Sequence, residues 1–198
     1  MSVIERMLGR DPADGPGPDG LVISPMRKRD LRDGVLETER DAYPTPWSPG
    51  VFQSEIEQMK RGSRHYVTAR RIGDGRSAGG GKSRARGRIV GHAGLWFTAD
   101  EAHVTNVAVH PEARRSGVGT ALMLALASEA IRRDCAAWTL EVRVSSVGAQ
   151  ELYRTFGFAP AGVRKKYYEN VEDAIVMWCH DIQGEEYAAR LDEIRTNR

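Results

Sequence analysis

The sequence has little of what marks membrane or disulfide-rich proteins. Two of its 198 residues are cysteines, and no apolar run approaches the ~20 residues that a membrane-spanning helix needs. Two cysteines form neither a disulfide framework nor a metal-binding spacing, so Cys135 and Cys179 are expected to be buried, reduced thiols. The N-terminus lacks the apolar segment of a secretory signal. These absences predict a soluble cytoplasmic protein with no membrane partner.

An excess of one charge is also missing. Twenty-nine lysines and arginines stand against 27 aspartates and glutamates, which gives a formal net charge of +2. Nucleic-acid binding usually relies on a dense basic surface, and this balance does not provide one. His92, His103 and His110 do not have the spacing of metal ligands. We therefore expect no direct nucleic-acid binding and no metal.

Glycine is the residue in excess, and much of the excess lies in two polar segments. Of the 21 glycines, four fall in residues 9–20 and six in residues 73–87. Neither segment has enough apolar side chains to repay the entropy of ordering. Residues 1–20 are therefore expected to be a flexible leader, and residues 73–87 a mobile insertion. Gly79–Ser83 resembles the end of a phosphate-binding Walker loop, but the preceding glycine and the following helix that the motif requires are absent.

Between and after these segments, hydrophobic periodicity predicts one domain over residues 21–182 and an amphipathic helix within residues 183–198. The C-terminal helix could pack on its own domain or contact a partner protein. Ser48 is a natural N-cap for one helix, and Pro49 suits its first position. The expected strands are 21–23, 65–72, 88–97, 102–109, 138–144 and 174–180. The expected helices are 28–42, a segment after Ser48, 121–132, and a segment that ends at Phe156 and that Ser145 or Ser146 is expected to cap.

The most informative local pattern is a strand followed by a glycine turn and a long apolar helix. The turn, Arg114–Thr120, leads directly into that helix. The first N–H groups of a helix have no internal partner and carry partial positive charge, so they bind phosphate where the backbone can come close. Gly117 and Gly119 permit this approach. The alternative is a helix that merely begins tightly after a strand, and the dinucleotide-binding fingerprint fails because Leu122 occupies its third glycine position.

The next strand and helix contain two candidates for proton transfer. Residues 138–144 alternate between apolar and polar side chains, which places Glu141 on the polar side together with Arg143. Taken alone, this glutamate is better explained by a solvent-exposed face or by an ion pair with Arg143. Tyr153 lies in the following helix, where a role in the core is the simpler explanation.

Six short motifs lie along residues 21–182. They are Val107-Ala108-Val109, Arg114-x-x-Gly117-x-Gly119, Leu140-Glu141-Val142-Arg143, Ala149-x-x-Leu152-Tyr153-x-x-x-Gly157-Phe158, Pro46-Trp47-Ser48 with Phe52, and Arg164-x-x-Tyr167-Tyr168 with Glu172-Asp173-Ala174. Taken together, these motifs resemble the GCN5-related N-acetyltransferase (GNAT) family, and within it the RimI family of bacterial acetyltransferases that modify a ribosomal protein N-terminus. The resemblance covers residues 21–182.

The resemblance implies a mixed α/β fold with a central, mostly antiparallel sheet, in which a parallel pair of strands splays apart to leave a cleft for acetyl-CoA. It also implies roles for single residues. Glu141 would be the general base and Tyr153 the general acid, in a monomer or weak dimer. The implied cofactor-binding residues are Val107, Ala108 and Val109 at the acetyl and pantetheine part, Arg114, Arg115, Ser116, Gly117, Val118, Gly119 and Thr120 at the pyrophosphate, and Ser146 at a position where the family usually has Asn.

The implied reaction is acetyl transfer from acetyl-CoA to the N-terminal alanine of the eighteenth small-subunit ribosomal protein. An α-amino group is neutral in roughly one molecule in ten at pH 7, whereas the pKa of a lysine lies about 3.4 units above pH 7. Because an α-amino group needs less help to lose its proton, a single glutamate suits an N-terminal substrate better. Two alternatives stay open. The acceptor could be a lysine side chain or a small-molecule amine, or the chain could be a non-catalytic domain that binds acetyl-CoA or docks on other proteins.

Overall fold

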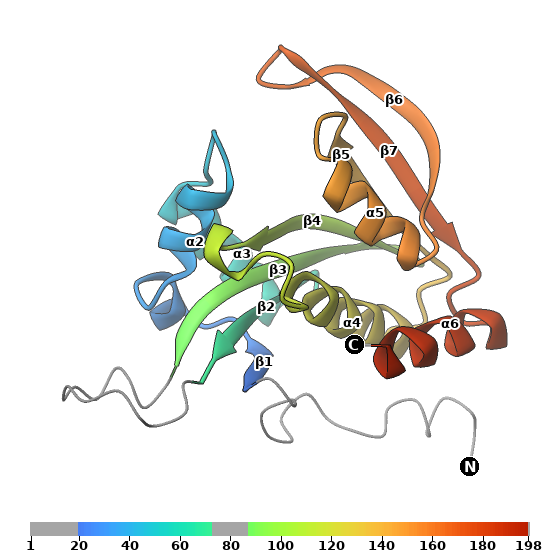
Figure 1. Ribbon diagram of the computed structural model, residues 1–198, viewed down its shortest axis with the longest axis horizontal. Coiled ribbons are helices and arrows are strands. Elements are labelled where there is room, and N and C mark those ends of the chain that lie inside the picture. The colour runs from blue at the N-terminus through green and yellow to red at the C-terminus, as the bar shows by residue number, and fades with distance from the viewer. Residues whose placement is uncertain (1–19, 73–86, 198) are drawn as a thin grey trace. The chain divides into compact units, whose positions relative to one another are not determined.

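The computed structural model describes residues 20–72 and 87–197 (Figure 1). Nearly all of the predicted leader and of the predicted insertion, with its Walker-like residues, lies outside this range. The described chain forms two compact units. The first unit contains the residues up to Gly94 together with Asn106–Leu126, and the second contains Leu95–Thr105 together with the residues from Ala127 onward.

A seven-stranded mixed sheet with the order β1-β2-β3-β4-β5-β7-β6 is the central element of the fold. The pairs β1·β2, β5·β7 and β6·β7 are antiparallel. Strands β4 and β5 are parallel, with Glu101–Val104 in register with Ala137–Leu140. The predicted fold class is thereby confirmed. The strands are β1 (Leu21–Pro25), β2 (Arg64–Arg71), β3 (Arg88–Thr98), β4 (Glu101–Val109), β5 (Ala137–Arg143), β6 (Ala159–Tyr168) and β7 (Glu172–His180).

The helices follow the predicted pattern with one clear exception. Ser48 accepts a hydrogen bond from Val51 N at 3.4 Å, which confirms the expected helix start. The single helix expected over residues 28–42 is wrong, because Gly34 has φ 140° and separates a 3-10 helix from an α-helix. The helical elements are η1 (Lys28–Leu31), α2 (Val35–Ala42), α3 (Pro49–Lys60), η3 (Pro111–Ala113), α4 (Val118–Arg132), α5 (Val147–Thr155) and α6 (Glu185–Thr196).

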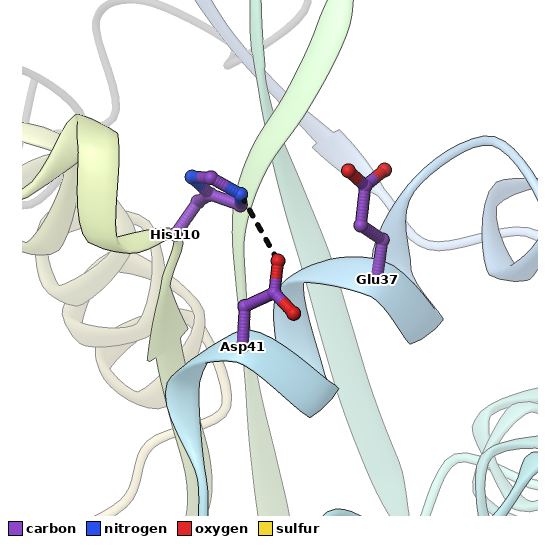
Figure 2. Close-up of side chains that lie close together, drawn as sticks. All are labelled: Glu37, Asp41 and His110. Atoms are coloured by element: carbon purple, nitrogen blue, oxygen red, sulfur yellow. Dashed lines mark ion pairs between the residues drawn. The ribbon is translucent and has the colours of Figure 1, made fainter.

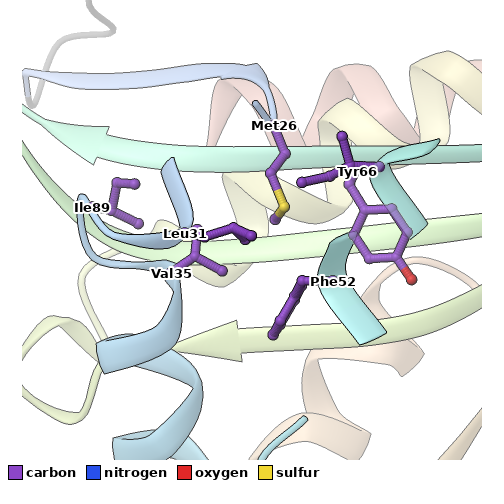
Figure 3. Close-up of a cluster of buried hydrophobic side chains, with 7 residues drawn as sticks. Met26, Leu31, Val35, Phe52, Tyr66 and Ile89 are labelled. Atoms are coloured by element: carbon purple, nitrogen blue, oxygen red, sulfur yellow. The ribbon is translucent and has the colours of Figure 1, made fainter. Parts of the chain in front are cut away.

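The core of the first unit gathers side chains from η1, α2 and α3 over strands β2 and β3 (Figure 3). Val35, Phe52 and Tyr66 are fully buried in it. Because α2 and α3 both pack on this cluster, the segment that joins them is held at both ends. The cluster consists of Met26, Leu31, Val35, Phe52, Ile56, Tyr66 and Ile89.

The second unit is built around the strands β5, β7 and β6, of which β6 and β7 form a long curved hairpin (Figure 1). Trp138 is fully buried, with its ring 4.6 Å from Phe158 and 6.4 Å from Tyr187 on α6. Sequence periodicity missed β6, since every residue from Ala159 to Tyr167 is exposed and no alternation marks it. Among the described residues, no helix is long and apolar enough to cross a membrane.

Candidate active site

The glycine turn lies in the first unit between β4 and α4, as the sequence predicted. Arg115 and Gly117 have φ values of 60° and 77°, which makes the turn tight enough for the helix to begin at Val118. Ala121 N donates to Gly117 O at 2.9 Å and is the first N–H to bond back to the turn. The N–H groups of Val118, Gly119 and Thr120 therefore have no intrahelical partner and can bind an anion.

Positive charge is concentrated at this turn. Arg71 at the end of β2 donates to Ser116 Oγ at 2.7 Å, and Ser116 Oγ donates to Ala113 O at 2.8 Å. Arg114 and Arg115 are exposed beside it. Val118 directs its side chain into the core, where it is 1% exposed, so only its backbone is available to a ligand. The charge and the free N–H groups suit a pyrophosphate.

The β4 segment next to the turn is held by a buried polar network that the sequence analysis did not identify. Glu39 on α2 is 1% exposed, and its carboxylate lies 2.9 Å from His92 Nε2. It accepts hydrogen bonds from Asn106 Nδ2 at 3.2 Å and from Trp47 N at 3.0 Å. Glu39 therefore joins α2, the α2–α3 segment, β3 and β4 within the first unit.

The predicted base, Glu141, lies in the second unit at the middle of β5. Its side chain is only 6% exposed and is held by an imidazole and a guanidinium group. Oε2 lies 2.9 Å from His103 Nε2 on β4, and Oε1 lies 3.0 Å from Arg164 Nη1 on β6. The hydrogen bond with His103 holds the pKa of Glu141 below its ordinary value, although burial acts in the opposite direction.

Arg143 is not the partner of Glu141, contrary to the ion pair considered from the sequence. Its guanidinium binds Glu169 at 2.7 Å and Glu172 at 3.0 Å, and it lies 4.1 Å from the centre of the Tyr168 ring. Tyr168 donates to the backbone oxygen of Glu141 at 3.1 Å. These contacts fix the β6–β7 hairpin against the strand that carries the carboxylate.

Tyr153, the predicted acid, lies on α5 and is 8% exposed, with its ring 5.9 Å from that of Phe158. Burial raises the pKa of Tyr153 to about 12, so the hydroxyl stays protonated over the neutral range. Glu141, His103, Arg164 and Tyr153 all belong to the second unit. That unit therefore combines a buried carboxylate, an imidazole and a neutral phenol.

Ser146 stands at the N-cap position of α5, but its side chain makes no capping hydrogen bond. The capping role expected from the sequence is therefore wrong. The end of β5 is tied to α5 by Gln150 instead, whose Nε2 donates to Arg143 O at 3.2 Å and to Val144 O at 2.9 Å. This arrangement leaves the Ser146 hydroxyl out of the helix cap.

One group of side chains in the described residues has the spacing of metal ligands: Glu37, Asp41 and His110 (Figure 2). His110 Nε2 lies 3.3 Å from Asp41 Oδ2. Arg88 Nη2 lies 2.9 Å from His110 Nε2 and 3.4 Å from Glu37 Oε1. A guanidinium group thus already supplies the positive charge at this cluster, and we assign no metal to it.

His103 is the residue whose place sequence reasoning could not find. The parallel register pairs His103 with Thr139, so His103 and Glu141 lie on the same face of neighbouring strands. Strand β4 alternates between half-buried and buried residues, and His103 is one of the half-buried ones. This position was the available signal that His103 could belong to the site. Without the register, nothing in the sequence joined it to Glu141.

Comparisons with known proteins identify the family of the chain. The acetyltransferase (GNAT) family model matches residues 32–158. A Bacillus subtilis (strain 168) protein named as a candidate ribosomal protein bS18-alanine N-acetyltransferase is 34% identical over 158 residues, which cover 79% of this chain and 93% of that protein. The ribosomal protein bS18-alanine N-acetyltransferase of Escherichia coli (strain K12) is 32% identical over 159 residues, covering 79% and 95%.

The fold is also found in solved structures. The crystal structure of the ribosomal-protein-S18-alanine N-acetyltransferase from Escherichia coli matches with a TM-score of 0.66 and 29% identity, over 81% of this chain and 94% of that one. The region matched by the family model contains Arg114–Thr120, Glu141 and Tyr153. The matched range therefore spans the glycine turn and the positions of both candidates for proton transfer.

Proposed function

The chain belongs to the acetyltransferase (GNAT) family, and we propose that it transfers the acetyl group of acetyl-CoA to the N-terminal alanine of ribosomal protein bS18. Relatives at 34% and 32% identity carry that activity in their names. The observation that carries the mechanism is Glu141, a carboxylate buried in a strand and held by His103 and Arg164. A carboxylate paired with an imidazole supports removal of a proton from an amine.

Acetyl-CoA would be held chiefly by the first unit. The N–H groups of Val118, Gly119 and Thr120 and the cations Arg71, Arg114 and Arg115 suit the pyrophosphate. The backbone of Val107–Val109 would contact the acetyl and pantetheine part, and the Ser146 hydroxyl would donate a hydrogen bond to the cofactor. The carbonyl of Val107 already accepts a hydrogen bond from Tyr43 at 2.6 Å, so the remaining groups of this strand would serve the ligand.

The proposed chemistry is direct transfer. The neutral α-amino group attacks the thioester carbonyl carbon. Glu141 belongs to the general base that takes up the proton of the amine, and Tyr153 donates a hydrogen bond to the leaving sulfur. Thiols ionise near pH 8.5, whereas burial raises the pKa of Tyr153 to about 12. Tyr153 therefore acts mainly as a hydrogen-bond donor that stabilises the departing thiolate.

Mass spectrometry of a peptide that copies the bS18 N-terminus tests the proposal. Wild type should add one acetyl group at the α-amino position. Glu141→Gln and Tyr153→Phe should each react about 10²–10⁴-fold more slowly, the range that general acid–base catalysis contributes. Glu151→Gln is the matched control, since Glu151 is an exposed residue of α5 with no proposed role, and it should react like wild type.

A second peptide with a blocked N-terminus and an internal lysine separates the alternatives. Faster acetylation of this lysine than of the N-terminal alanine would refute the proposed substrate. Cofactor binding without turnover on either peptide, or on a panel of small amines, would indicate a non-catalytic domain. Unaltered rates in both active-site variants would refute the assigned roles.

A further inference from the structure

His103 is the neighbour of Glu141 that an incoming amine can reach more easily than the carboxylate itself. The two side chains meet at 2.9 Å through Nε2 and Oε2, yet they differ in exposure: Glu141 is 6% exposed and His103 is 26% exposed. Arg164 occupies the other carboxylate oxygen at 3.0 Å. An approaching amine therefore finds both oxygens of Glu141 engaged and reaches the imidazole more easily than the carboxylate.

The second nitrogen of the imidazole is open. Nε2 faces the carboxylate and donates its hydrogen to it, which leaves a lone pair on Nδ1 in the neutral ring. Within residues 20–72 and 87–197, no group forms a hydrogen bond with His103 Nδ1. The ring also contacts Trp96 on β3 at 6.2 Å between centroids, nearly edge to face, so its plane is set from two sides.

Glu141 by itself is poorly matched to an amine. General-base catalysis is most effective when the base titrates near the working pH, and the contact with His103 moves the pKa of Glu141 further below that range. Histidine side chains exchange protons in the neutral range. The carboxylate is better suited to stabilising an imidazolium than to accepting the proton itself.

We propose that His103 and Glu141 act as a dyad in which Nδ1 of His103 accepts the proton of the attacking amine, while Glu141 holds the ring through Nε2. This proposal rests on the function proposed above, and within that function it moves the role of proton acceptor from Glu141 to its neighbour His103. His103 would contact the reacting nitrogen, directly or through one water molecule. Glu141 would then be a positioning and charge-stabilising residue.

The proton and electron pairs balance in this scheme. The amine nitrogen forms the new C–N bond with the thioester carbon, and the surplus proton on nitrogen passes to His103 Nδ1. The C–S bond breaks with its electron pair on sulfur, and the thiolate takes a proton from solvent after accepting a hydrogen bond from Tyr153. The imidazolium beside the Glu141 carboxylate then releases its proton to solvent, which restores the neutral ring.

The side chains around the imidazole set its electrostatic surroundings. In the described residues, β5 presents Glu141, β6 presents Arg164 behind that carboxylate, and β3 presents the neutral indole of Trp96. Tyr168 donates to the Glu141 backbone and stays protonated, because burial raises its pKa. A proton already on Nδ1 would remove the acceptor that the amine needs.

The test compares the steady-state rates at which His103→Gln, His103→Ala and wild type acetylate the peptide that copies the bS18 N-terminus, with His180→Gln as the matched control. His180 is an exposed histidine of the same unit, stacked on Trp178 at 5.3 Å. Glutamine can still donate to Glu141 but cannot take up a proton. His103→Gln should lower kcat by about 10²–10⁴-fold with little change in KM, and the deficit should shrink as pH rises.

Chemical rescue separates a catalytic role from a structural one. Imidazole added to His103→Ala should raise kcat in proportion to its concentration, and it should leave wild type, His180→Gln and Glu141→Gln unaltered. Acetyl-CoA binding, measured by calorimetry, should stay at the wild-type value in both His103 variants, which shows that they are folded.

Each result decides between the two proposals. An active wild type with unaltered His103 variants, or with His103→Ala that imidazole fails to rescue, overturns the dyad and leaves the proposed function standing. A wild type that acetylates no N-terminal peptide overturns the proposed function, and the dyad with it, because no reaction would remain for it to serve.

Discussion

The hydroxyl group of Tyr43 donates a hydrogen bond of 2.6 Å to the backbone carbonyl oxygen of Val107, the residue at which the proposed cofactor segment of β4 begins. A second, longer contact of 3.3 Å joins the same hydroxyl to Asn106 Oδ1. Tyr43 is the C-cap of α2, and Glu39 on that helix accepts from Asn106. The end of α2 thus fixes the backbone of β4 through two side chains.

Removal of this hydroxyl should weaken both stability and cofactor binding. Tyr43→Phe loses a hydrogen bond to a backbone carbonyl, which costs about 0.5–1.5 kcal/mol of unfolding free energy. Because the freed β4 backbone is less well positioned, the KM for acetyl-CoA should rise several-fold while kcat changes less. Urea denaturation and steady-state kinetics measure the two effects. A variant with wild-type stability and KM would show that the contact positions nothing.

A side chain at the glycine turn should also weaken cofactor binding. Gly117 has φ 77°, a conformation that costs an L-residue about 1–2 kcal/mol, so Gly117→Ala should distort the turn that precedes α4. Acetyl-CoA affinity should fall about tenfold, as 1.4 kcal/mol implies. Calorimetric titration measures it.

Gly162→Ala serves as the control for this change, because a Cβ atom there would meet nothing within 4 Å. It should bind acetyl-CoA like wild type. Equal losses of affinity in both variants would mean that the effect comes from general destabilisation instead of the turn.

Ionisation of Tyr153 should not lower kcat at alkaline pH within the range where enzymes are usually assayed. Burial raises the pKa of Tyr153 to about 12, so the phenol remains a donor up to about two units above its ordinary value near 10. The kcat of wild type should therefore stay level between about pH 8.5 and 10, where free tyrosine begins to ionise. A decline over that range that disappears in Tyr153→Phe would contradict this assignment.

Glu141 should contribute acid-sensitive stability. Its pKa is lowered in the folded protein, chiefly by His103, so the folded state binds fewer protons than the unfolded one. The contribution is present above the ordinary glutamate value of about 4.3 and is lost as pH falls through the lowered folded value. Urea midpoints of wild type should therefore drop more steeply between about pH 5 and 3 than those of Glu141→Gln.

Other carboxylates act with the same sign and set the background for that comparison. The pKa of Glu57 is lowered to about 2 by Lys28 and Lys60, and those of Glu172 and Asp173 are lowered by hydrogen bonds. They are present in both proteins, so the difference between the two pH curves isolates Glu141. Parallel curves would refute its coupling to His103.

Local sequence patterns predicted most elements of the fold. Ser48 and Pro49 placed the start of α3, and the apolar helix after Gly117 is present as α4. The failures have local causes as well. Gly34 breaks the expected first helix with its φ of 140°, and a Cβ atom added there would lie only 3.1 Å from Ile89 Cβ on β3. Strand β6 is exposed along nearly its whole length and shows no alternation. Both errors arise from contacts that no window of sequence contains.

The sequence alone determined the family resemblance, the glycine turn and the presence of a carboxylate in the strand after it, since each depends on residues close together in the chain. Only the tertiary structure decided what that carboxylate contacts. Glu141 could have faced Arg143 on its own strand, but the parallel register of β4 and β5 places His103 beside it and the β6–β7 hairpin places Arg164 there. Register and hairpin geometry are set by packing between distant segments, and the partners of Glu141 follow from them.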